Sequence, residues 1–192
     1  MSDLAAALRP HLEQDPRGTP SPGDRLAAVL ALVVEEPAPS VLFTERTATM
    51  SRHAGEVSFP GGLQDPEDRS LLDTALREAA EEIGLARGST DVLGALPAIH
   101  TFVSGILVTP FVGVTRSLPR LRVSDAEIAR VLVTPLTRLA EVEEERELHR
   151  EGARVWKGWW YELDDATVWG ATGSMLHALL GLMRKEAPWT VS

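Results

Sequence analysis

Three glutamates crowd one short segment of the chain. Glu78 stands three residues before Glu81 and four residues before Glu82, so a helix would carry the three carboxylates on one face. Like charges at this spacing cost about 0.2–0.5 kcal/mol per pair, and acids in the last turn of a helix oppose its dipole. A bound divalent cation would remove this penalty, because Mg²⁺ and Mn²⁺ prefer carboxylate oxygens. The segment therefore predicts a metal site.

An ordinary surface helix would account for the same spacing without a metal ion. In that interpretation the acids face solvent and Arg77 pairs with Glu81, since glutamate-rich helices are common. The preceding turn favours the metal site instead. Gly61 and Gly62 follow Pro60, and adjacent glycines let a phosphate or a cation approach main-chain atoms closely.

The glutamates can act together only on a helix of fixed orientation. Ser70 is the expected N-cap, and Gly84 is the expected residue after the last turn. An apolar stripe on the opposite side would face the core and turn the carboxylates away from it. The stripe consists of Leu72, Leu76, Ala79 and Ile83.

The other elements that must position this helix alternate in type along the chain. The patterns predict strands over residues 26–34, 40–44, 56–59, 91–99, 107–114 and 155–163. Helices are predicted over residues 3–9, 134–140 and 172–185. A hairpin is expected at residues 37–39, and the glycine pair is expected to end the third strand. Interleaved strands and helices indicate a layered α/β or α+β fold.

The composition is that of a single globular domain with an acidic surface. The 192 residues carry a formal net charge of -9 and no cysteine, which excludes disulfides and disfavours non-specific nucleic-acid binding. No apolar run approaches the roughly 20 residues of a membrane span, and no secretion signal is evident. We therefore expect a cytoplasmic protein with no nucleic-acid or membrane partner.

The chain divides into a short N-terminal segment and one domain. Residues 1–23 are interpreted as an N-terminal helix followed by a linker rich in proline and glycine, and residues 24–192 as the domain. Within the domain, residues 141–147 hold five acids and one arginine, and such a run is typical of a solvated surface segment.

The glycine turn and the acidic helix together resemble the Nudix box. That motif has a glycine, five residues, a glutamate, seven residues and then Arg-Glu-x-x-Glu-Glu-x-Gly. Here five residues separate Gly62 from Asp68, and eight separate Asp68 from Arg77, so the box is one residue longer. The extra residue and the upstream segment 53–62 are similar to the coenzyme A pyrophosphatase-like subgroup of the Nudix hydrolase superfamily. The resemblance covers about residues 27–182.

This resemblance implies a fold, a reaction and a set of metal ligands. The implied fold is an α/β/α sandwich with a central mixed sheet and a loop-helix-loop catalytic motif. The implied reaction is hydrolysis of a diphosphate bond in a nucleotide derivative, with Mg²⁺ or Mn²⁺ as cofactor. Glu78 and Glu82 would be the principal metal ligands, Glu81 a further ligand or water-bridged partner, and a main-chain carbonyl near Gly61 or Gly62 would complete the site.

The remaining roles fall to residues inside and outside the box. Arg77 would orient a box glutamate by a charge-assisted hydrogen bond. The general base is Glu78 in the first interpretation and Glu127, on a distal loop, in the second. Arg46 and His53 would contact the phosphate or the adenosine of the substrate, and a buried hydrogen-bonded role fits His53 equally well.

The expected partner is a small nucleotide. Coenzyme A or an acyl derivative, cleaved to 3′,5′-ADP and 4′-phosphopantetheine, is the first interpretation. The alternatives are ADP-ribose, NADH, dinucleotide polyphosphates or nucleoside triphosphates, and a non-catalytic nucleotide-binding module. All three box glutamates are present, which disfavours the module. A homodimer is also predicted, from the subgroup and from a strand carrying Trp156, Trp159 and Trp160, where packing or a dimer face is favoured over ligand stacking.

Overall fold

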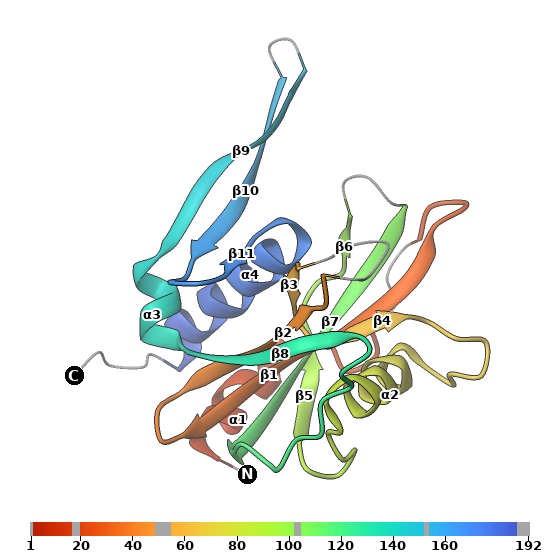
Figure 1. Ribbon diagram of the computed structural model, residues 1–192, viewed down its shortest axis with the longest axis vertical. Coiled ribbons are helices and arrows are strands. Elements are labelled where there is room, and N and C mark those ends of the chain that lie inside the picture. The colour runs from red at the N-terminus through yellow and green to blue at the C-terminus, as the bar shows by residue number, and fades with distance from the viewer. Residues whose placement is uncertain (1, 17–19, 49–54, 102–104, 152–153, 188–192) are drawn as a thin grey trace.

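A mixed β-sheet separates two layers of helix in this protein. The structure, a computed structural model, describes residues 2–16, 20–48, 55–101, 105–151 and 154–187. Helix α2 (Leu71–Ile83) covers one face of the sheet, and α4 (Gly170–Glu186) covers the other (Figure 1). The sandwich and the α+β class expected from the sequence are confirmed.

The centre of the sheet is a long parallel ladder. Strand β1 (Arg25–Glu36) runs parallel to β7 (Ile106–Ser117) from end to end. The odd-numbered side chains of β1 from 27 to 33 lie in the core under α4, and the even-numbered ones from 28 to 32 lie under α2. Because both faces are covered, the strand is one continuous apolar run.

Shorter strands complete the sheet on both sides of this ladder. Strand β2 (Ser40–Arg46) forms the expected hairpin with β1. Strands β5 (Asp91–Ala95) and β6 (Ile99–His100) both pair with β7. They were predicted as one strand, but residues 96–98 leave the ladder between them.

The outer edge of the sheet was only partly predicted. Strand β8 (Ile128–Pro135) pairs with β2 and was not predicted. It includes the first two residues of the helix predicted over 134–140, so α3 (Leu136–Glu141) begins after them. Pairing with β2 decides the state of this segment, and a non-local partner is not visible in a local pattern.

The glycine pair follows the end of one strand and begins another. Strand β3 (Val57–Ser58) ends before the glycines, as predicted. Strand β4 (Gly61–Leu63), which was not predicted, pairs antiparallel with β1 and packs beside α2. The backbone at Gly61 lies too close to β1 for a side chain. A Cβ there would lie 2.4 Å from the carbonyl oxygen of Ala28.

A second, three-stranded sheet extends from the body as an arm. Strands β9 (Glu143–Glu151) and β10 (Arg154–Glu162) form a long hairpin, and β11 (Thr167–Val168) pairs with the base of β10 (Figure 1). Strand β9 was not predicted, because its sequence is almost entirely charged and shows no apolar alternation. Its acids are largely exposed, as expected for a solvated segment, and such an edge resists pairing with other chains.

The N-terminal segment contributes to the core under α4. Helix α1 (Asp3–Leu8) is followed by a 3₁₀ turn, η1 (Arg9–His11), which contains Pro10. Leu8 and Leu12 are buried in the same cluster as the apolar side chains of α4. In the parts of the chain that the structure describes, no helix is long and apolar enough to cross a membrane.

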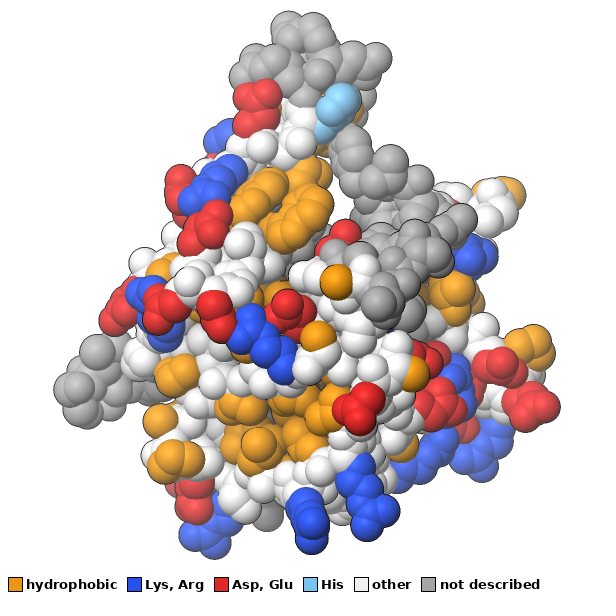
Figure 2. Space-filling view, in the orientation of Figure 1, with side chains coloured by type: hydrophobic (Ala, Val, Ile, Leu, Met, Phe, Trp, Pro, Cys, Tyr) orange, Lys and Arg blue, Asp and Glu red, His pale blue; other side chains and the backbone are white. Residues whose placement is uncertain are grey.

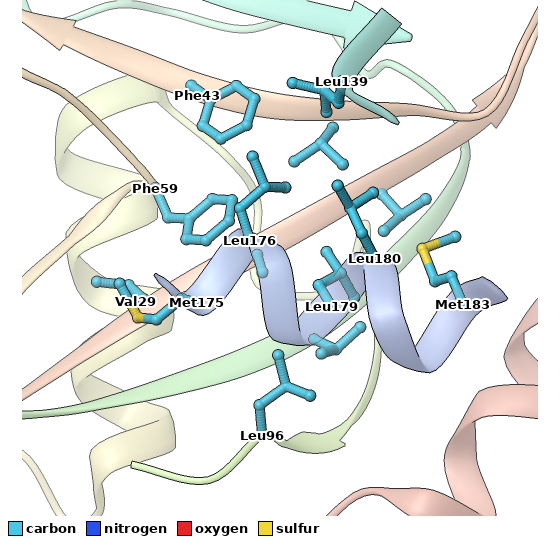
Figure 3. Packing of buried hydrophobic residues seen from close by; sticks show 14 of the residues in the cluster. Val29, Phe43, Phe59, Leu96, Leu139, Met175, Leu176, Leu179, Leu180 and Met183 are labelled. Carbon is cyan, nitrogen blue, oxygen red and sulfur yellow. The ribbon is translucent and has the colours of Figure 1, made fainter. Parts of the chain in front are cut away.

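Helix α4 packs on the sheet through a stripe of buried apolar side chains. Phe59, just after β3, is buried beside this stripe, and its ring stacks on Phe43 with ring centroids 5.2 Å apart (Figure 3). The buried apolar residues of α4 are Met175, Leu176, Leu179, Leu180 and Met183.

The base of the arm lies directly against the first turns of α4. A Cβ at Gly173 would lie 2.2 Å from the carbonyl oxygen of Trp159 on β10. The carboxylate of Glu143 on β9 accepts hydrogen bonds from Tyr161 on β10 and from Arg184 on α4. The arm is therefore anchored to α4 both through the main chain and through side chains.

Replacing Gly173 with alanine should destabilise the protein, because the methyl group would overlap the main chain of β10. Overpacking of this kind costs about 1–3 kcal/mol, or roughly 2–10 °C in Tm for a chain of this size. Gly181, in the same helix, has nothing within 4 Å of an added Cβ. Gly181→Ala should therefore leave Tm unchanged or raise it. Thermal unfolding followed by circular dichroism measures both variants. A Gly173→Ala variant with the Tm of the parent would contradict the close approach of α4 to β10.

Candidate functional site

Helix α2 has the predicted ends, and its buried face matches the predicted stripe in part: Ala79 and Ile83 are buried, whereas Leu72 and Leu76 are half-buried against the core. The Ser70 hydroxyl accepts the N–H of Asp73, and Gly84 adopts a left-handed conformation (φ 67°) after the last turn. The prediction that all three glutamates point away from the core was wrong for Glu82. Small side chains on the inner face bring the helix close to β4 and turn Glu82 inward. The buried residues of α2 are Thr74, Ala75, Ala79, Glu82 and Ile83.

Glu82 is almost completely buried at the end of α2. Its side chain is 3% exposed, its Oε2 accepts the N–H of Gly61 at 3.2 Å, and its Oε1 lies 3.5 Å from the guanidinium of Arg46. Burial raises the pKa of Glu82 to about 7, while the Gly61 hydrogen bond and Arg46 act in the opposite direction. The negative charges of Glu78 and Glu127 raise this pKa further.

Glu78 lies against the second glycine of β4. A Cβ at Gly62 would lie 2.5 Å from Oε1 of Glu78, so the glycine leaves room for the carboxyl group in its present position. Glu78 is partly buried, and this burial raises its pKa. The hydrogen bond and charge of Arg77 lower the pKa, and the charges of Glu81 and Glu127 raise it. Gly61 therefore donates to the carboxyl group of Glu82, and Gly62 lies against that of Glu78.

A buried ion pair holds Arg77 in place. Its Nε and Nη2 donate to the two carboxylate oxygens of Asp68 at 3.0 and 2.9 Å, and the Thr74 hydroxyl donates to the same carboxylate. The Arg77 guanidinium holds the pKa of Asp68 well below its usual range. The remaining Nη1 donates to Glu78 at 2.8 Å and to Glu81 at 3.0 Å.

Asp68 is a site residue to which sequence reasoning assigned no role. The aspartate is one methylene shorter than the usual glutamate of the box, and the spacer behind it is one residue longer. Despite both changes, Asp68 forms a two-point pair with Arg77. The sequence did contain a signal for this role. An acid stands at the box position before Arg77, and a partly buried arginine needs an ionic partner.

Glu81 is the most exposed of the three box glutamates. Its side chain is 60% exposed, and the pair with Arg77 has the i,i+4 geometry expected for a surface helix. Among the described residues, no three acidic or histidine side chains converge closely enough to hold a metal ion as they stand. Arg77 binds one oxygen of Glu78 and one of Glu81, so metal binding would require these carboxylates to exchange the arginine for the cation.

A loop from the far side of α2 brings in one more acid. Glu127 is exposed just before β8, and its charge acts on both Glu78 and Glu82. The loop is attached to the helix, because the N–H of Ser124 donates to the carbonyl oxygen of Glu82 at 2.8 Å. His53, the other predicted substrate contact, lies outside the described residues.

The assembled groups suit a polyanionic substrate held with cations. Carboxylate oxygens are the ligands that hard divalent ions prefer. The guanidinium group of Arg46 lies beside Glu82, where it can pair with a phosphate oxygen, whereas Arg77 holds Asp68, Glu78 and Glu81. The structure therefore brings together the predicted site residues on α2 and β4 and places Arg46 and Glu127 beside them.

Comparison with known proteins relates the chain to one family. The NUDIX domain family matches residues 24–179. The chain is 38% identical over 174 residues to the uncharacterized Nudix hydrolase NudL of Pectobacterium atrosepticum, covering 88% of each chain. It is 35% identical over 183 residues to NudL of Photorhabdus laumondii, covering 93% of this chain and 95% of the relative.

Solved structures share the fold. RenU, a Nudix hydrolase from M. smegmatis, aligns with a TM-score of 0.52 at 21% identity, covering 61% of this chain and 74% of its own. The NUDIX domain of Shewanella oneidensis NrtR, complexed with ADP ribose, aligns with a TM-score of 0.51 at 20% identity, covering 62% and 77%. Nudix hydrolases generally use divalent metal cations. The chain belongs to the Nudix hydrolases, which cleave pyrophosphate bonds in nucleotide derivatives.

Proposed function

We propose that this Nudix hydrolase cleaves the diphosphate bond of coenzyme A or an acyl-coenzyme A, releasing 3′,5′-ADP and 4′-phosphopantetheine. The observation that carries the catalytic part is the grouping of Glu78, Glu82 and Glu127 around Gly61 and Gly62. The longer box and the segment before the glycine pair, both similar to the coenzyme A pyrophosphatase-like subgroup, support the substrate.

Mg²⁺ or Mn²⁺ would be held by Glu78, Glu81 and Glu82, together with a main-chain carbonyl near the glycine pair. The donor set fits a hard cation, because the buried carboxyl of Glu82 has a raised pKa and would be relieved by a positive charge. When bound, the ion would neutralise phosphate charge and lower the pKa of a water molecule. Asp68 would keep Arg77 in place while Glu78 and Glu81 turn to the cation.

The protein's own side chains supply orientation and proton transfer. Glu78 is the first choice for the base that accepts a proton from the attacking water, because Arg77 and Gly62 hold it in place. Glu127 is the second choice, from its exposed position near the cluster. The water oxygen bonds to one phosphorus as the bridging P–O bond breaks, and the other phosphate group leaves with the bridging oxygen.

Substrate contacts complete the proposal. Arg46 and His53, together with the main chain of Gly61 and Gly62, would bind the phosphate or adenosine part of the substrate. The contact of Arg46 with Glu82 supports its placement at the site. ADP-ribose, NADH, dinucleotide polyphosphates and nucleoside triphosphates remain the alternative substrates for the same chemistry.

A homodimer and a cytoplasmic location stay predictions from the sequence. Light scattering would measure the oligomeric state.

Product analysis by mass spectrometry on a mixed panel tests the substrate. With Mg²⁺ or Mn²⁺ present, coenzyme A should give 3′,5′-ADP and 4′-phosphopantetheine with a kcat/KM at least about tenfold above those of ADP-ribose, NADH and diadenosine polyphosphates, a difference of about 1.4 kcal/mol. A clear preference for another member of the panel would overturn the substrate and leave the reaction intact. Turnover of no member by a metal-loaded, folded protein would overturn both.

Glu82→Gln should lower kcat by about a hundredfold or more with the fold retained, because the neutral amide is a poor ligand for a hard cation. Glu67→Gln provides a matched control, since Glu67 is an exposed acid in the loop of the same motif, and it should retain parental activity. Steady-state kinetics and circular dichroism make the comparison. A fully active Glu82→Gln variant would exclude Glu82 as a metal ligand.

The metal-free protein should lose stability as pH rises, and Glu82 should account for much of the loss. Its pKa is raised from 4.5 to about 7 in the folded state. Its contribution to stability is therefore complete below about pH 4.5 and is lost as pH rises through 7. The cost above that pH is on the order of 3 kcal/mol.

Glu82→Gln resembles the protonated acid and should match the parent in Tm near pH 4.5 but exceed it near pH 8 in the presence of a chelator. Glu81→Gln, at the exposed position in the same turn, should show no such gain. Differential scanning calorimetry at the two pH values measures the effect. A constant difference between parent and Glu82→Gln at both would contradict the burial of a charged carboxylate.

A further inference from the structure

Two tryptophans form a stacked pair at the junction of the arm and α4. Trp160 on β10 and Trp169, the residue before α4, have ring centroids 5.9 Å apart and ring planes 21° from parallel. Trp169 is 44% exposed, and Trp160 is partly exposed. Figure 2 shows hydrophobic side chains gathered on the arm. Exposed aromatic surface of this kind is typical of a binding surface.

The pair lies next to the strand that leads into the catalytic glycines. Strand β11 immediately precedes Trp169 and packs beside β3. From Ser58, at the end of β3, three residues lead to Gly61, a distance of at most about 11 Å. Phe59, within this segment, packs beside Leu176 of α4 (Figure 3). Short segments therefore connect the tryptophan pair to the glycine pair: one residue from Trp169 to β11, the contact of β11 with β3, and three residues from Ser58 to Gly61.

Side-chain contacts hold the segments next to this pair in place. Arg130 on β8 donates to Glu45 on β2 at 2.5 Å and also pairs with Asp165, just before β11. Trp159, the residue before Trp160, stacks its ring on His177 of α4 with centroids 3.6 Å apart. A surface that is already ordered loses little entropy when a ligand binds.

We propose that Trp160 and Trp169 form the stacking surface for the adenine base of the nucleotide substrate. This inference rests on the proposed function, because the base must belong to the molecule whose diphosphate lies at Glu82 and the glycine pair. Coenzyme A, ADP-ribose and NADH all carry adenosine, so the assignment holds for each of them. An uncharged aromatic surface suits the adenine base, which is flat and neutral, and each stacked base is worth about 1–3 kcal/mol.

A second copy of the chain is a poorer fit to this surface. A stable dimer buries about 800 Å² on each partner. A tryptophan side chain covers at most about 250 Å², and both rings are already partly covered by one another and by the chain. The neighbouring edge strand β9 is densely charged, which disfavours its pairing with another copy. The sequence favoured packing or a dimer face for Trp160, and its pairing with Trp169 could not be read from the local pattern.

The test measures the affinity of the base-bearing product and of the product without a base. Trp169→Ala and Trp160→Ala should each weaken binding of 3′,5′-ADP by about tenfold or more in calorimetric titrations. Binding of 4′-phosphopantetheine should change less than twofold. The KM for coenzyme A should rise in parallel, with kcat nearly unchanged. Trp169→Phe should retain most of the affinity, and Trp156→Ala, further along the same strand, should behave as the parent protein.

Folded alanine variants that bind 3′,5′-ADP as the parent does would overturn the proposal. So would a selective loss of 4′-phosphopantetheine binding, or a change from dimer to monomer without a change in affinity. If an alanine variant does not fold, quenching of tryptophan fluorescence by 3′,5′-ADP decides, because it should be weaker in Trp169→Phe than in the parent. Weakened 3′,5′-ADP binding in a protein that hydrolyses no panel member would retain the stacking surface and reject the proposed function.

Discussion

The close approach of α2 to strand β4 is the constraint on which the site depends. It exists because Gly61 and Gly62 carry no side chains and because the inner face of α2 is formed by small residues. A Cβ at Gly61 would meet the main chain of β1, and a Cβ at Gly62 would meet the carboxyl group of Glu78, so β4 or that carboxyl group would have to shift. A shift of β4 would weaken the hydrogen bond from the Gly61 N–H to Glu82 and leave Arg46 as the group that compensates its burial.

Arg77 makes three ion pairs, and the difference between the pairs with Asp68 and Glu81 explains how the site can be both fixed and adaptable. The pair with Asp68 is nearly buried and has two hydrogen bonds, whereas the pair with Glu81 is exposed. Exposed pairs contribute about 0–1 kcal/mol, and removing one partner of a buried pair costs several times more. Asp68 therefore determines where Arg77 lies. Glu78 and Glu81 are partners that Arg77 can release.

Sequence patterns predicted the elements with strong local signals. The serine cap and the final glycine predicted the ends of α2, and the apolar patterns predicted β1, β7 and α4, which are buried. The spacing of the box motif was enough to predict that Arg77 and the three glutamates lie together, because residues three or four apart share a helix face.

What the sequence could not predict depends on partners far along the chain. Strands β8 and β9 exist because β2 and β10 pair with them, and their own side chains show no regular alternation. The inward turn of Glu82 depends on the distance between α2 and β4, and the spacing of residues along a helix does not determine that distance. Likewise, Trp160 and Trp169 meet only because β11 returns along β10.

The parallel ladder between β1 and β7 bears on how the chain acquires its shape. The ladder joins positions about 80 residues apart, so the entropy of closing that loop is lost before the central strands gain any contact. During synthesis, the long apolar β1 must wait for β7, while its pairings with β2 and β4 and its packing against α2 can form first. We expect this interval to be the period in which the nascent chain is most prone to aggregate and most in need of a chaperone.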